Sequence, residues 1–202
     1  MECLIGIQFN DYVLLAADCN GGRSIISMKD DVDKMFRLSE RLAIIVSGES
    51  GDTNKFAEFI EQNVQLYKIR HGYELSPYAA ANFTRRNQAQ SLRSRSPYFV
   101  NMLLAGYDAN KGQPELYYLD YLGSLMKLPF SVIGYGGYMS LSVLDRHYRP
   151  DMAEADGIRL LRTVISEIQK RLVISLSKFR VHRVDRNGVT QLDDIESKLV
   201  TP

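Results

Sequence analysis

Residues 1–18 contain the pattern that decides the fold. They begin Met1-Glu2-Cys3-Leu4-Ile5-Gly6-Ile7 and, after a polar turn at Asn10-Asp11, continue Val13-Leu14-Leu15-Ala16-Ala17-Asp18. The second run is almost continuously apolar, which is typical of a strand that is covered on both faces. The polar turn between the two runs predicts an antiparallel hairpin. We therefore expect this hairpin to lie between other layers of the molecule.

The rest of the chain groups its expected strands and helices. Apolar runs predict further strands at Met35–Leu38, Leu42–Val46, Phe99–Ala105, Leu116–Asp120, Phe130–Ile133, Arg180–Val184 and Val189–Leu192. Helices are expected from about 52 to 70, from Ser76-Pro77 to near Arg95, after Gly134-Tyr135-Gly136-Gly137, and from a capping box of Asp151 and Glu154 to about Leu172. Grouped elements indicate the α+β class. Two packed sheets with helix pairs outside give a four-layer α-β-β-α sandwich.

Composition limits the function classes. The 202 residues are 45% hydrophobic and 24% charged, which fits one domain over 1–192 with a short polar tail at 193–202. The net charge of +1 gives no global attraction to nucleic acid or to an anionic membrane. The apolar runs are too short to span a bilayer, and residues 1–7 lack the positive region of a secretory signal, so neither feature is expected.

Cysteine and histidine usage favours neither a disulfide framework nor a metal site. Cys3 and Cys19 are the two cysteines, and this usage predicts a reducing compartment, the cytoplasm and nucleus. The three histidines are far apart, so no metal is expected. The acidic stretch 30–33 lacks the glycine and glutamate of a calcium loop and is expected to be a solvated turn. The glycine-rich turn 134–137 lacks the lysine of a phosphate-binding loop, and we expect no cofactor.

Several segments, in order and at matching spacing, carry a family resemblance over about 1–192. They are Val13-Leu14-Leu15-Ala16-Ala17-Asp18, Asp33-Lys34-Met35, Ser47-Gly48-Glu49-Ser50-Gly51-Asp52 and Gly106-Tyr107-Asp108. Together they resemble the beta subunits of the proteasome, which have the N-terminal-nucleophile hydrolase fold. Further segments, such as Tyr73-Glu74-Leu75-Ser76-Pro77 and Arg93-Ser94-Arg95-Ser96-Pro97-Tyr98, resemble the type-2 branch, which fills the beta-4 position of the 20S core particle.

The resemblance implies a catalytic site that lacks its nucleophile. In active members an N-terminal threonine attacks the peptide carbonyl, and a lysine, an aspartate and a glycine N–H assist it. By resemblance Lys34, Asp18 and Gly48 occupy those three positions, whereas Glu2 occupies that of the threonine. Tyr135 also replaces a serine of active members. These differences imply a non-catalytic subunit in which Asp18 and Lys34 remain as an ion pair.

Leu172 departs in the same way, because active members place an aspartate there, although Ser175 matches the serine that follows.

Two other functions stay open at this stage. Trimming to Cys3 would create a thiol N-terminal nucleophile and hence an active peptidase. Against it, Glu2 is too large to favour methionine removal, and no propeptide precedes Cys3 in this sequence. The second alternative is a free-standing binding module that reuses the fold.

The resemblance also implies partners, namely the other alpha and beta subunits of a hetero-oligomeric stack of 28 subunits that degrades ubiquitin-tagged proteins. The loop around 69–75 would face the alpha ring, and helices at about 137–172 would face the opposite beta ring. Candidate interface residues are Ile69, Arg70, Tyr73, Tyr138 and Tyr148, with packing inside the subunit as the alternative.

A basic run accompanies the second helix and consists of Arg85, Arg86, Arg93 and Arg95. We expect it to be a solvated or subunit-contacting face. RNA contact is the alternative, although the net charge of +1 does not favour it.

Overall fold

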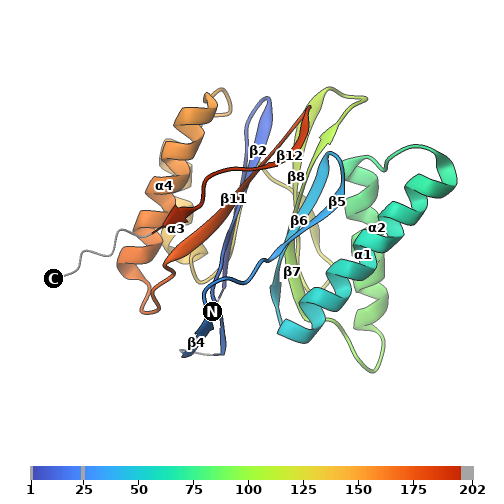
Figure 1. The fold of residues 1–202 in the computed structure, drawn as a ribbon, viewed down its shortest axis with the longest axis horizontal. Helices are drawn as coiled ribbons and strands as arrows, with labels where there is room; N and C mark the ends of the chain where they lie inside the picture. The colour runs from blue at the N-terminus through green and yellow to red at the C-terminus, as the bar shows by residue number, and fades with distance from the viewer. Residues whose placement is uncertain (1, 24–25, 197–202) are drawn as a thin grey trace.

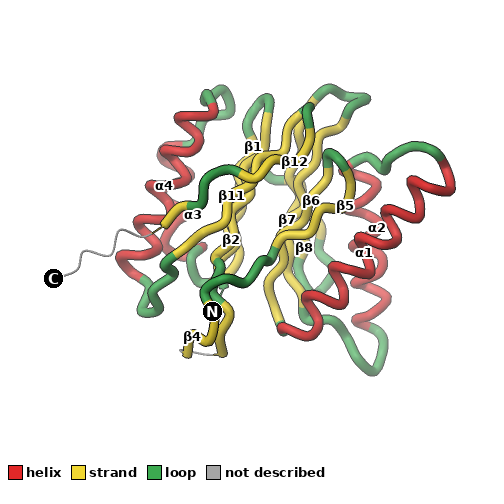
Figure 2. Tube along the Cα trace, in the orientation of Figure 1, coloured by secondary structure: helices red, strands yellow, loops and turns green. Residues whose placement is uncertain are grey.

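The computed structural model describes residues 2–23 and 26–196. Within them the molecule has four layers, and the helix pairs form the two outer ones (Figure 1). Helices α3 (Gly137–His147) and α4 (Glu154–Arg171) cover one side, and α1 (Ser50–His71) and α2 (Pro77–Leu92) cover the other. The strands lie between the helix pairs as two facing sheets (Figure 2). The predicted α+β class and α-β-β-α sandwich are confirmed.

The sheets are antiparallel. The sheet next to α3 and α4 has the order β10 (Phe130–Gly134), β1 (Cys3–Gln8), β2 (Tyr12–Asp18), β11 (Lys178–Asp185) and β12 (Gly188–Gln191), with β13 (Ile195–Glu196) also paired to β11. The sheet next to α1 and α2 has the order β5 (Met35–Ser39), β6 (Leu42–Gly48), β7 (Val100–Asp108), β8 (Gln113–Leu119) and β9 (Leu125–Lys127). A separate hairpin, β3 (Gly21–Arg23) and β4 (Ile26–Lys29), projects beyond both sheets (Figure 1).

The continuous apolar runs are explained by burial on both faces of the strands. In β2, Leu14 and Ala16 pack in the core against α4, whereas Val13 and Leu15 pack between the sheets. Alternate residues of a strand point to opposite faces, so both sets must be apolar here. On β1, Gly6 allows close sheet contact, because a Cβ there would press on Leu116 and Leu103 at 3.0 to 3.1 Å.

Helix ends follow local rules in part. Helix α1 ends at Gly72 in the left-handed conformation, with φ at 77°, and Ser76 accepts a hydrogen bond from Ala79 N at the start of α2. Helix α2 ends at Leu92, earlier than predicted. The predicted capping box is wrong, because the N-cap of α4 is Ala153 and makes no side-chain cap bond. No helix among residues 2–23 and 26–196 is long and apolar enough to cross a membrane.

Some elements were not expected from the sequence. Strands β3 and β4 form a hairpin outside both sheets. Strand β4 does alternate apolar and polar residues (Ile26, Ser27, Met28, Lys29), but the run is only four residues long and all four are exposed. Strand β13 lies inside the segment 193–202 that was expected to be a tail, and Ile195 is buried against the core. The domain therefore extends to Glu196. The remainder of the expected tail, 197–202, lies outside the described residues.

Candidate functional site

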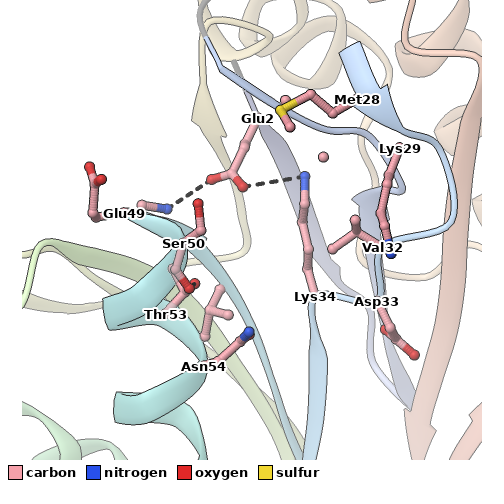
Figure 3. A pocket seen from close by; sticks show the side chains of 14 residues that line it. Glu2, Met28, Lys29, Val32, Asp33, Lys34, Glu49, Ser50, Thr53 and Asn54 are labelled. Carbon is pink, nitrogen blue, oxygen red and sulfur yellow. Dashed lines mark hydrogen bonds and ion pairs between the residues drawn. The ribbon is translucent and has the colours of Figure 1, made fainter.

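A cleft of about 810 Å³ opens where the β3–β4 hairpin, the start of β5 and the start of α1 meet. Figure 3 shows Glu2 reaching into it from the start of β1, opposite Lys34 of the segment that leads into β5. Gly48 at the end of β6, Thr53 of α1 and Met28 of β4 also line the cleft. Elements that are distant in sequence thus bring together the positions that the resemblance singled out.

Asp18 and Lys34 form a buried ion pair at this cleft. Lys34 Nζ lies 2.7 Å from Asp18 Oδ2, and both side chains are at most 5% exposed. Asp18 also accepts hydrogen bonds from the backbone N–H groups of Cys3, at 2.7 Å, and Asn20, at 3.1 Å. Lys34 donates a second bond to the carbonyl of Asn20 at 2.9 Å. Each buried charge is therefore both paired and hydrogen-bonded, as a low-dielectric site requires.

The carboxylate of Glu2 bridges two groups of the site. Its Oε1 lies 3.4 Å from Lys34 Nζ, and its Oε2 accepts the backbone N–H of Gly48 at 2.8 Å (Figure 3). Gly48 has φ at 149°, and a Cβ there would collide with the carbonyl oxygen of Phe99, so glycine is required. The N–H of Gly48 thus points to the cleft. The group that accepts its hydrogen bond is the Glu2 carboxylate of the same chain.

Cys3 lies directly beside this network but points elsewhere. Its side chain is buried in the core between helices α3 and α4 and the sheet next to them. A Cβ on Gly136 would collide with its sulfur. Burial raises the pKa of the Cys3 thiol, and the nearby Asp18 carboxylate raises it further. The protonated thiol is the favoured form at neutral pH, and it is a poor nucleophile.

The other positions compared with active members, the departures Tyr135 and Leu172 and the match Ser175, lie apart from the cleft lining. Tyr135 is 56% exposed in the turn between β10 and α3, where its ring lies 6.5 Å from that of Tyr138. Leu172 caps α4 and packs on the core beneath it, and Ser175 is exposed. Among the described residues, the hydrogen bonds of Lys34 and Glu2 do not include these three.

Four of the five candidate interface residues are exposed. Ile69 is 79%, Tyr73 59% and Tyr138 87% exposed, and Arg70 is exposed as well. Tyr148 differs, because it packs against Phe9 and Phe130 and donates a hydrogen bond to the carbonyl of Gln8 at 2.7 Å. Tyr148 therefore fits the alternative of packing inside the subunit and is not a free surface anchor.

Comparison with known proteins identifies the family of this chain. The family described as "Proteasome subunit" matches residues 2–184. The chain belongs to the proteasome beta-subunit family. Proteasome subunit beta type-4 of Saccharomyces cerevisiae is 44% identical over 98% of this chain and 100% of its own length. Proteasome subunit beta type-2-B of Arabidopsis thaliana is 44% identical over 95% of each chain, and the beta type-2 subunit of rice is 42% identical over 95% of this chain and 89% of its own.

Sequence reasoning missed the contacts that Glu2 makes in this beta subunit. Asp18, Lys34 and Gly48 were identified by resemblance, and the structure brings all three to one site. Glu2 was interpreted as a residue that lacks a hydroxyl, without a role of its own. The available signal was its position, because a carboxylate at the nucleophile position must lie within reach of Lys34. That reasoning would have predicted the Glu2–Lys34 ion pair.

Proposed function

We propose that this chain is a non-catalytic, structural beta subunit of the 20S proteasome core, at the beta-4 position. It would complete a beta ring within a stack of 28 subunits, help wall the proteolytic chamber and support ATP- and ubiquitin-dependent protein degradation. The cytoplasm and nucleus are the proposed compartments, since the two cysteines are buried free thiols. The single observation that carries the proposal is the position of the Glu2 carboxylate.

Glu2 opposes catalysis in two ways. A carboxylate has no hydroxyl to attack a peptide carbonyl, and it occupies the Gly48 N–H that would stabilise an oxyanion. An oxyanion forming about 4 Å from this carboxylate would be repelled by roughly 4 kcal/mol at an effective dielectric constant of 20. The charge of Lys34 is likewise shared between Asp18 and Glu2. Lys34, Asp18 and the N–H of Gly48, which assist catalysis in active members, are here joined to one another or to Glu2 by ion pairs and hydrogen bonds.

The exposed surface supports a role in assembly. Tyr138 and Ile69 are large side chains that the fold leaves almost fully exposed, on the α3 layer and at the end of α1 respectively. Val173, just after α4, is 94% exposed. Tyrosine is enriched among the residues that anchor protein–protein interfaces, which supports such a role for Tyr138. Other proteasome alpha and beta subunits are the proposed partners.

The proposal is tested by covalent labelling of isolated core particles with a peptide epoxide that reacts with N-terminal nucleophiles. We expect label on other beta subunits and none on this chain, and intact mass should show Glu2 and Cys3 both retained. Label on this chain, or a chain that begins at Cys3, would overturn the proposal and favour the thiol peptidase. Recovery of the chain only as a species of 23.0 kDa would favour the free-standing module.

A further inference from the structure

Helix α2 carries an arginine-lined groove on its outer face. The hollow has a volume of about 490 Å³ and is lined by Asn82, Arg85, Arg86, Ala89, Gln90 and Arg93. Asn82, Arg86, Ala89 and Arg93 follow one another at three- and four-residue intervals, so they share one face of the helix. The opposite face of α2, which includes Ala80, Ala81 and Thr84, is buried against the sheet. We call this hollow the α2 groove.

The guanidinium groups of the arginines in the α2 groove have no polar partner among the described residues. All three are exposed, and among the described residues their guanidinium groups take part in none of the ion pairs or side-chain hydrogen bonds. Arg93 lies at the C-terminal end of α2, where a positive charge is favoured by the helix dipole. Arg85 and Arg86 lie in the middle of the helix and gain nothing there. The three positive charges line one groove, and an anion bound between them would be attracted to all three.

We propose that the α2 groove binds an acidic segment of a partner protein. The guanidinium fork donates two parallel hydrogen bonds to a carboxylate, and the amide side chains of Asn82 and Gln90 add polar partners in the groove. Ala89 lies between Arg86 and Arg93 in the helix sequence and adds no charge of its own to the groove. Those two arginines are seven residues apart, about 10 Å along a helix axis. Carboxylates on the same face of an extended peptide are two or four residues apart, about 7 or 13 Å, and the long arginine side chains can adjust to either spacing.

The neighbourhood of the groove favours a peptide over a nucleic acid. Its lining has no aromatic side chain on which a base could stack. The turn 120–124 lies against the helix, because a Cβ on Gly123 would be 3.3 Å from the Cβ of Ala89. Leu122 in that turn is 54% exposed, and it is the chain neighbour of Gly123, which packs on Ala89 of the groove. A segment that combines glutamate or aspartate with an apolar residue matches this surface.

This inference goes beyond the proposed function, because the groove would bind such a segment whether or not the chain is in a core particle. It is tested with the full-length chain and a fluorescein-labelled peptide of eight glutamates, by fluorescence anisotropy at low and moderate salt. The test variant replaces Arg85, Arg86 and Arg93 with Gln. The matched control replaces Lys55, Arg162 and Arg186 with Gln, which removes the same charge from three scattered exposed positions.

We expect saturable binding to the wild-type chain, a loss of at least tenfold in the groove variant and a change of less than about twofold in the control. A third variant with Arg85, Arg86 and Arg93 replaced by Lys keeps the charge but loses the planar fork, and it should bind with intermediate affinity. Circular dichroism and melting temperature verify that each variant is folded.

Three results would overturn the inference. The first is absence of saturable wild-type binding below about 1 mM peptide, and the second is equal loss in the groove variant and the control. The third is tighter binding of an eight-residue oligothymidylate that depends on the same arginines, which would make the groove a nucleic-acid site. None of these results bears on labelling of the core particle, so the proposed function is judged separately.

Discussion

Two buried carboxylates in this molecule are held by lysines, and they differ in where those lysines lie. Asp18 and Glu115 are both 0% exposed. The partner of Asp18 is Lys34, whose side chain is 5% exposed, at 2.7 Å. Glu115 on β8 receives Lys127 at 2.8 Å and Lys111 at 3.0 Å, and these side chains are 43% and 52% exposed. The hydroxyl of Tyr117 also donates to Glu115, at 2.8 Å.

The difference shows how burial of the lysine partner affects the stability lost when the carboxylate is removed. If Asp18 is removed, Lys34 loses its nearer charge partner in a site that water barely reaches and keeps only Glu2 at 3.4 Å, and an incompletely paired buried charge is costly. If the charge of Glu115 is removed, Lys111 and Lys127 can turn to solvent. Removing a lysine–carboxylate contact should therefore lower the free energy of unfolding more at Asp18 than at Glu115. The predictions below test this inequality, from the largest expected effect to the smallest.

Asp18→Ala should cause the largest loss of stability. The change leaves the buried Lys34 ammonium with only the more distant Glu2 carboxylate, at 3.4 Å, as a charge partner. It also leaves the N–H groups of Cys3 and Asn20 without their acceptor, so we expect about 3 to 5 kcal/mol less free energy of unfolding. Urea unfolding of the isolated chain measures it. Asp33→Asn is the control, because Asp33 pairs with Arg180 at 2.7 Å but its side chain is 53% exposed. An equal loss of free energy of unfolding in the two variants would contradict the idea that burial makes the Asp18 contact more stabilising.

Lys34→Met should cost less, about 2 to 3 kcal/mol, because Asp18 keeps its two backbone donors. In cells we expect fewer core particles that contain the variant, because a less stable subunit assembles less often. The peptidase activity of each assembled particle should stay unchanged. Native gel electrophoresis with activity staining measures both quantities. Selective loss of one peptidase activity in intact particles would instead mean that Lys34 acts on a neighbouring catalytic site.

Glu115→Gln should cost about 1 to 2 kcal/mol at neutral pH, because its lysine partners can be solvated. Burial acts to raise the pKa of Glu115, but hydrogen bonds from Lys127, Tyr117 and Lys111 outweigh it and lower the pKa from 4.5 to about 2. Since the pKa is lower in the folded state, this stabilisation is present above pH 4.5 and disappears as the pH falls toward 2.

The stability difference between wild type and Glu115→Gln should therefore close over that acidic range. Urea unfolding at a series of pH values measures it. A difference that is constant from neutral pH to pH 2 would show that the glutamine acts through packing instead of charge.

Glu2→Gln should have the smallest effect, below about 1 kcal/mol. The side chain of Glu2 is 30% exposed, and Lys34 keeps Asp18 as its partner. The amide oxygen of glutamine can still accept the N–H of Gly48. Thermal unfolding compares this variant with wild type. A loss as large as that of Lys34→Met would mean that Glu2 belongs to the buried pair instead of lying at its edge.

Much of the fold could be predicted from local patterns. The apolar runs at 13–17 and 42–46 indicated strands covered on both faces, and those strands lie between helices and a second sheet. Ser76, Pro77 and Gly72 marked helix ends correctly. The capping box at Asp151 and Glu154 failed because spacing alone does not set where the first turn begins. Strand β4 alternates apolar and polar residues, but Ile26 and Met28 are 66% and 75% exposed, so this short alternation does not mark a buried face.

The candidate site was predictable only in part. The resemblance identified Asp18, Lys34 and Gly48, but Glu115 belongs to no motif and its neighbours on β8 read as an ordinary strand. The cluster at Glu115 depends on Lys127, which β9 brings alongside by pairing with Tyr117. Such partners are set by strand register, which a sequence pattern does not specify.

The sequence by itself determined the layered α+β architecture, the family and the residue types available at the cleft, because these depend on the order of apolar, polar and glycine residues. Only the tertiary structure decided that the Glu2 carboxylate joins Lys34 to the N–H of Gly48, that the thiol of Cys3 is buried, and that three arginines of α2 line one groove. Each of these depends on distances between segments far apart in the chain, and on whether burial or water surrounds a charge.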